Sequence, residues 1–177
     1  MPSGKFHDAI TCVLTIPVFA VSSLASTDLL ASTVVTVSFL FGGLMFGPDL
    51  DTVSRPYTRW GPVRLIWLPY RHFFPHRSRF SHGLLFGALF RVIYFLGVAT
   101  LIFLLGVTLY GMALTGGVPG YADILNFWSP VGGALRLHLG SEILVIVFIG
   151  LWAGAASHTF TDMAGSFIKT GRSGKFF

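Results

Sequence analysis

The chain has 177 residues, of which 53% are hydrophobic and only 11% are charged, and its mean hydropathy is +0.74. This composition excludes an ordinary soluble domain, because the apolar residues are grouped into blocks long enough to cross a bilayer. The formal net charge of +5 does not predict a nucleic-acid partner, since membrane topology accounts for the basic residues. We therefore expect an integral membrane protein with a single membrane domain, residues 1–177.

Four apolar blocks predict four membrane-spanning helices, at residues 9–26, 29–47, 83–114 and 141–158. A polar segment, residues 48–82, separates the second block from the third. The single cysteine, Cys12, lies inside the first block and has no partner for an internal disulfide. The expected fold class is all-α, an integral membrane four-helix bundle.

The basic residues predict the orientation of these spans. Four spans place both termini and the 48–82 segment on one side, which carries ten of the lysines and arginines, whereas the opposite loops carry only Arg136 (Arg91 lies in the third block and is not counted). The positive-inside rule therefore places both termini in the cytoplasm or an equivalent compartment, in a bacterial inner or thylakoid membrane. The stretch "RWGPVRLIWLPYRHFF" favours an interfacial anchor on the lipid headgroups, with a platform for a lipid substrate as the alternative.

Most titratable side chains fall on this same side: His7, Asp8, Asp49, Asp51, His72, His76, His82, His158 and Asp162. The cytoplasmic ends of a bundle are neighbours, so these residues can converge. "HTFTD" places His158 and Asp162 one helical turn apart, and "PDLD" places Asp49 and Asp51 just after the second span. Imidazole and carboxylate groups bind zinc, manganese, iron or nickel. Each pattern alone is also typical of helix caps, turns and ordinary ion pairs, but their shared location predicts a metal site.

Four motifs, "GKFHD", "FGGLMFGPDLDT", "PHRSRFSHG" and "SHTFTD", carry a family resemblance over nearly the whole chain. Together they resemble the cyanobacterial-type family of metal-binding membrane proteins of unknown function. More distantly they resemble the inner-membrane metal-dependent hydrolases, which are similar in turn to zinc phospholipases C and single-strand nucleases. The resemblance implies seven metal ligands: His7, Asp49, Asp51, His76, His82, His158 and Asp162.

The chain departs from the hydrolase pattern at two positions. Ser81 stands where the broader group has threonine, which keeps a hydroxyl group. Ser78 stands where that group often has glycine, and this difference weakens the link to the hydrolases.

Three functions remain open on this basis. Seven ligands would serve one zinc ion with outer-shell support, or two zinc ions, and a two-metal site suits a hydrolase of a phosphoester or lipid-linked substrate. Arg77 and Arg79 lie between His76 and His82 and can hold a substrate phosphate as catalytic residues, although positive-inside topology also explains them.

The alternative to an enzyme is a non-catalytic, metal-stabilised scaffold or assembly factor of a larger complex. Its glycine-rich stretches, "FGGLMFG" and "GLWAGAAS", would pack against a membrane protein partner. A metal transporter is disfavoured, because the predicted spans lack an ionisable residue near their centres.

Overall fold

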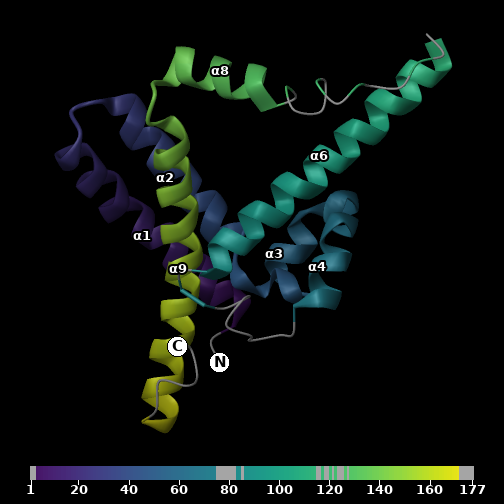
Figure 1. Ribbon diagram of the computed structural model, residues 1–177. Helices are drawn as coiled ribbons and strands as arrows, with labels where there is room; N and C mark the ends of the chain where they lie inside the picture. The colour runs from purple at the N-terminus through teal and green to yellow at the C-terminus, as the bar shows by residue number, and fades with distance from the viewer. Residues whose placement is uncertain are drawn as a thin grey trace. The chain divides into compact units, whose positions relative to one another are not determined.

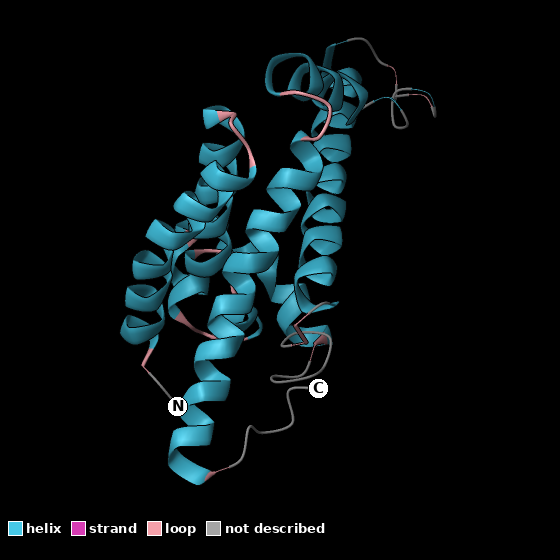
Figure 2. Ribbon diagram, turned by 90° about the vertical axis from the view of Figure 1, so that its left-hand side faces the viewer, coloured by secondary structure: helices cyan, strands magenta, loops and turns pink. Residues whose placement is uncertain are grey.

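The computed structural model describes residues 3–74, 83–84, 86–114, 117, 120, 122, 126 and 128–171, without the side chains of residues 138, 139 and 170. Within these residues the secondary structure is helical and contains no strand, which confirms the all-α class (Figures 1 and 2). In chain order, the elements are α1 (Gly4–Ala25), α2 (Leu29–Leu44), η1 (Pro48–Asp51), α3 (Arg55–Arg59), η2 (Gly61–Trp67), α4 (Leu68–Phe73), α6 (Phe86–Leu114), α8 (Trp128–Leu139) and α9 (Ile143–Thr170).

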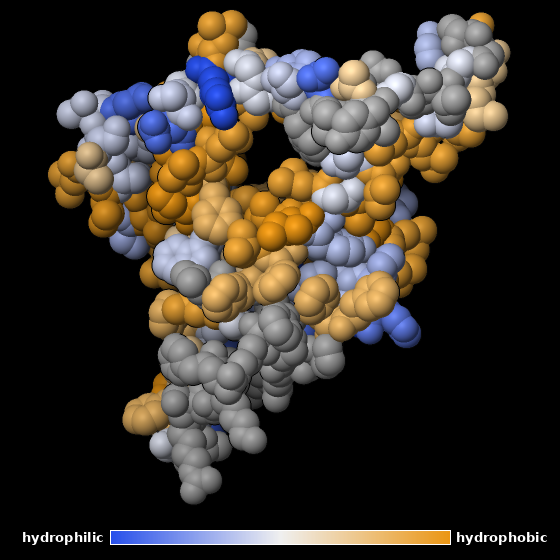
Figure 3. All heavy atoms as spheres, viewed as in Figure 1, coloured by the Kyte–Doolittle hydropathy of each residue, from blue (hydrophilic) through white to orange (hydrophobic). Residues whose placement is uncertain are grey.

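Three of the described helices are long and apolar enough to cross a membrane: α1, α6 and the Ile143–Lys169 part of α9. The second predicted span forms a shorter apolar helix, α2, of 16 residues. At 1.5 Å per residue α2 covers about 24 Å, less than the roughly 30 Å of a bilayer core. Many hydrophobic side chains on these helices are exposed, and they cover much of the face seen in Figure 3, as is usual where a surface meets lipid rather than water.

The chain divides into two compact units, one comprising Met1–Arg91 with Leu144–Phe177 and the other Val92–Ile143. The second unit holds most of α6 together with α8. The first unit holds α1, α2, α9 and the short helices between residues 48 and 73. The predicted four-helix bundle is therefore not confirmed as such, and the candidate site lies within the first unit.

Glycines bring α2 and α9 into close contact inside the first unit. A Cβ atom added at Gly154 would overlap the backbone of Phe39, and one added at Gly150 would lie 2.5 Å from the Cβ of Ser38. Gly43 of α2 leaves room in the same way for the side chain of Thr11 in α1. The glycine-rich stretches thus pack against neighbouring helices of this chain, which draws the polar ends of α1, α2 and α9 together.

The segment that follows α2 folds into a small aromatic core. Trp67 and Tyr70 are fully buried, and their rings meet edge to face at 5.7 Å. Phe46 contacts Trp67 in the same manner at 5.4 Å, and the indole of Trp60 donates a hydrogen bond to the carbonyl of Met45. Trp67 and Tyr70 are shielded within the protein, whereas Leu65 and Phe73 of the same stretch are exposed, so the interfacial anchor stays a prediction. The segment acts as a folded cap over the end of α2.

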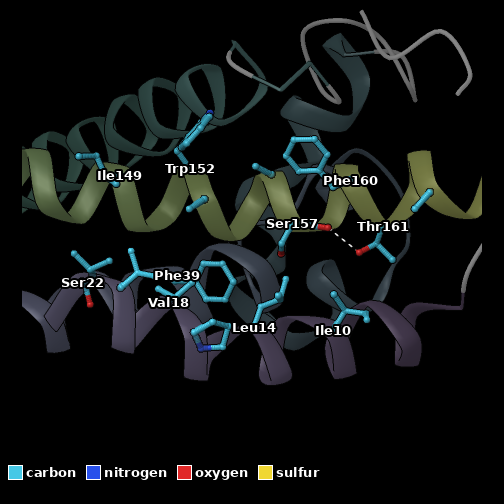
Figure 4. Close-up of a pocket in the computed structure, with 16 residues that line it drawn as sticks. Ile10, Leu14, Val18, Ser22, Phe39, Ile149, Trp152, Ser157, Phe160 and Thr161 are labelled. Atoms are coloured by element: carbon cyan, nitrogen blue, oxygen red, sulfur yellow. Dashed lines mark hydrogen bonds between the residues drawn. The ribbon is translucent and has the colours of Figure 1, made fainter. Parts of the chain in front are cut away.

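An apolar groove of about 790 Å³ runs between α1, α2 and α9 (Figure 4). Its lining includes Leu14 and Val18 of α1, Phe39 of α2, and Trp152 and Phe160 of α9. The groove belongs to the apolar part of the first unit, and its lining includes none of the candidate metal ligands.

Candidate metal centre

Three buried side chains converge where α1 begins and where α9 approaches its polar end. His7 projects from the first turn of α1, and His158 and Asp162 lie one turn apart on α9. Their candidate ligand atoms all lie within 4.8 Å of one another, and each residue is at most 5% exposed. The Nε2 atom of His7 is 3.3 Å from Oδ1 of Asp162, and Nε2 of His158 is 3.8 Å from Oδ2 of the same carboxylate.

These distances fit the coordination sphere of a transition metal. Bonds of about 2.0–2.1 Å in tetrahedral geometry place neighbouring ligand atoms roughly 3.3 Å apart. The His7 and His158 rings stack in parallel, with centroids 3.8 Å apart and an interplanar angle of 7°.

The hydrogen bonding of the two imidazoles also fits a metal. In the described part of the chain, Nδ1 of His158 and Nδ1 of His7 have no hydrogen-bond partner, and Nε2 of His158 approaches the carboxylates of Asp49 and Asp162 without forming a hydrogen bond. Leaving buried polar atoms unsatisfied costs free energy, about 1–3 kcal/mol per group. A bound ion would satisfy one nitrogen of each ring, so the residues present match the ligand set of a metal site.

Asp49 lies beside this cluster, at the wall of a polar pocket. Its Oδ2 atom is 3.2 Å from Nε2 of His158, and its side chain is 27% exposed. The pocket has a volume of about 420 Å³, and His7, His158 and Asp49 all contribute to its lining together with Asp8 and Arg55. The cluster therefore borders an accessible cavity.

Asp51 is more deeply buried than Asp49. It is 5% exposed, and it interacts electrostatically with Arg91, which is 2% exposed near the start of α6. Arg91 also hydrogen-bonds Tyr70, and burial raises the pKa of that tyrosine, an effect that the nearby guanidinium partly opposes. Because a raised pKa keeps Tyr70 neutral, the carboxylates provide the opposite charge for Arg91. Arg91 thus experiences the charges of both Asp51 and Asp49, and among the described residues Asp51 is not part of the three-residue cluster.

A second polar group, absent from the predicted site, forms the rim of the pocket. Both carboxylate oxygens of Asp8 accept hydrogen bonds from Arg59, at 2.9 and 2.6 Å, and Arg55 approaches Oδ2 of Asp8 at 2.8 Å. Arg59 also donates to the carbonyl of Leu44 at 2.8 Å. From the sequence, Arg55 and Arg59 indicated only the orientation of the membrane spans. No local sequence pattern predicts that they pair with Asp8.

The remaining predicted site residues, His76, His82, Arg77 and Arg79, lie outside the described residues. Their roles as ligands and phosphate-binding groups stay predictions. His72 is described and exposed, away from the cluster.

Taken together, a helical protein with candidate membrane spans and a buried histidine–aspartate cluster has the character of a metal-binding membrane protein. The chain matches the family described as "Uncharacterized metal-binding protein (DUF2227)" over residues 2–172, and it belongs to that family. No similar protein was found among the curated proteins, and none among the solved structures.

Proposed function

We propose that the protein is a membrane-bound, metal-dependent hydrolase that cleaves a phosphoester, with a lipid-linked phosphoester as the favoured substrate class. Zinc is the preferred ion, with manganese, iron or nickel as alternatives. The supporting observation is that two of the three buried ligands, His7 and His158, line a polar pocket. Structural zinc sites are closed by four protein ligands, whereas catalytic sites keep a position open. On the count of basic residues, both termini and the site face the cytoplasm.

Each polar residue has a distinct role in this proposal. His7, His158 and Asp162 would hold the ion, which would supply Lewis-acid activation of a water molecule. Asp49 lines the pocket and is more exposed than the three ligands, so we assign its carboxylate the role of accepting a proton from the attacking water. The oxygen of that water joins phosphorus, the bond from phosphorus to the ester oxygen breaks, and the proton passes to the leaving alkoxide.

An activity screen on metal-loaded protein in detergent tests the proposal. Chromogenic phosphomonoesters and phosphodiesters, and phosphatidic acid in mixed micelles, serve as substrates. We expect turnover that a chelator abolishes and that Asp49→Asn lowers by about a hundredfold or more while the metal content stays near the wild-type value. Metal-loaded protein that turns over none of these substrates would contradict the hydrolase and favour the non-catalytic scaffold.

A further inference from the structure

The pocket beside the metal cluster is lined in part by an ion-paired arginine. One carboxylate, that of Asp8, faces two guanidinium groups, those of Arg55 and Arg59. Arg55, at 46% side-chain exposure, is the arginine of this pair that lines the pocket, where Asp8 balances its charge and Asp49 adds a negative one.

Arg55 is also the donor that remains available there. Arg59 uses one nitrogen on Asp8 and Leu44 and its other terminal nitrogen on Asp8. In the described part of the chain, the ion pair of Arg55 with Asp8 uses only Nη1. The two hydroxyl groups in the lining already donate to backbone carbonyls, Ser54 to Asp49 at 2.7 Å and Thr58 to Arg55 at 3.0 Å.

Two features hold Arg55 in place. Asp8 anchors its Nη1 atom at 2.8 Å. On the opposite side, Gly4 provides space for the stem of the side chain, because a Cβ atom at Gly4 would lie 2.9 Å from Cδ of Arg55. A guanidinium fixed in this way loses little further conformational entropy when it binds a planar or tetrahedral anion.

We infer that this pocket is a binding site for a phosphate-class anion, with Arg55 as its positioning and specificity-determining residue. The inference deepens the proposed function and rests on it for the class of ligand. Phosphate would contact the Arg55 guanidinium from one side and lie toward the wall formed by His7 and His158. Asp49 and Asp162 are negatively charged, so binding requires the metal ion that offsets them.

Calorimetric titration of the full-length, metal-loaded protein with inorganic phosphate tests the site without any turnover. We expect wild-type protein to bind phosphate and metal-free protein to bind it far more weakly. Arg55→Gln should weaken binding by about tenfold to a hundredfold, the usual effect of losing a charged hydrogen bond. Arg64→Gln is the matched control, because it removes the same charge from an exposed arginine outside the pocket lining and should leave the affinity unchanged.

Gly4→Ala supplies a second variant that keeps the guanidinium. It should weaken phosphate binding in the same direction as Arg55→Gln, because the added methyl group displaces the Arg55 stem. Phosphatidic acid added in mixed micelles then distinguishes the source of the anion. Competition with inorganic phosphate identifies a lipid headgroup, and its absence identifies a soluble phosphate or phosphoester; both support the site.

Equal phosphate affinities in wild type, Arg55→Gln and Gly4→Ala would overturn the inference, as would no phosphate binding by the metal-loaded wild type. These results are separable from the proposed function. Turnover that survives Arg55→Gln with unchanged phosphate affinity would leave the hydrolase standing without this site. Arginine-dependent phosphate binding without turnover of any phosphoester would leave the site standing without the hydrolase.

Discussion

At the scale of single residues, the two carboxylates of "PDLD" perform different tasks. Asp49 lies at the pocket, 3.2 Å from His158, whereas Asp51 is buried and has the larger electrostatic effect of the two on Arg91. The sequence suggested that both turn toward one site. They occupy η1, a 3₁₀ helix, in which residues two apart point about two thirds of a turn away from each other.

This division predicts unequal effects on stability. Asp51→Asn should lower the free energy of unfolding by about 3 kcal/mol, because it removes the larger of the two carboxylate charges that act on the buried guanidinium of Arg91. Asp49→Asn is the matched control, since its carboxylate is partly exposed and its loss should cost much less. Chemical unfolding in detergent measures both variants. Equal stability of the two variants would contradict the assignment of Asp51 to Arg91.

The residue scale also separates what the sequence could predict from what it could not. His158 and Asp162 were predictable as a pair, because their spacing alone places them on one helical face. The approach of His7 depends on how α1 packs near α9, and the ion pairs of Asp8 link residues about fifty positions apart. No local pattern encodes such contacts, so Arg55 indicated only topology.

At the scale of elements, the site depends on how closely α2 and α9 approach. Gly154 lies one turn before His158 on α9 and contacts the backbone of Phe39. Asp49 lies in η1, a few residues beyond the end of α2, so the same contact affects the distance between Asp49 and His158. The glycine motifs were predictable, but their partner was not, because a small-residue face suits a helix of the same chain as well as one of another chain.

Substituting Gly154 tests whether the metal site depends on the close contact between α2 and α9. Gly154→Ala should destabilise the protein by about 1–3 kcal/mol and weaken metal binding, because its methyl group forces α9 away from α2. Gly97→Ala in α6 is the control, since a Cβ atom there has no neighbour within 4 Å. Thermal unfolding and metal titration are the measurements. If Gly154→Ala were as stable as Gly97→Ala and bound metal as tightly, the close contact between α2 and α9 would not be needed for the metal site.

The small aromatic core that follows α2, with Trp67 and Tyr70 at its centre, is a second feature that the sequence pattern did not predict. Arginine interleaved with tryptophan and tyrosine is typical of a membrane interface. Trp67 and Tyr70 are instead fully buried, because the short helices fold back and enclose their rings. The composition of an interfacial segment and that of a small aromatic core overlap, so only the folded arrangement distinguishes them.

At the scale of the whole molecule, the proposed topology places the metal site on the cytoplasmic face. In a background lacking Cys12, a thiol introduced at Arg64 should react with reagent from the cytoplasmic side, and one introduced at Ser141 should react from the opposite side. Both positions are exposed, so burial would not mask either thiol. Labelling of both positions from one side would contradict the arrangement of spans.

The central claim is that His7, His158 and Asp162 form a metal site, and metal analysis of the whole protein tests it most directly. Protein purified without added metal should carry one or two transition-metal ions per chain. His7→Ala and His158→Ala should each lose most of this metal, while His72→Ala, which removes an exposed histidine, should keep it. Full metal occupancy in both His7→Ala and His158→Ala would contradict the account.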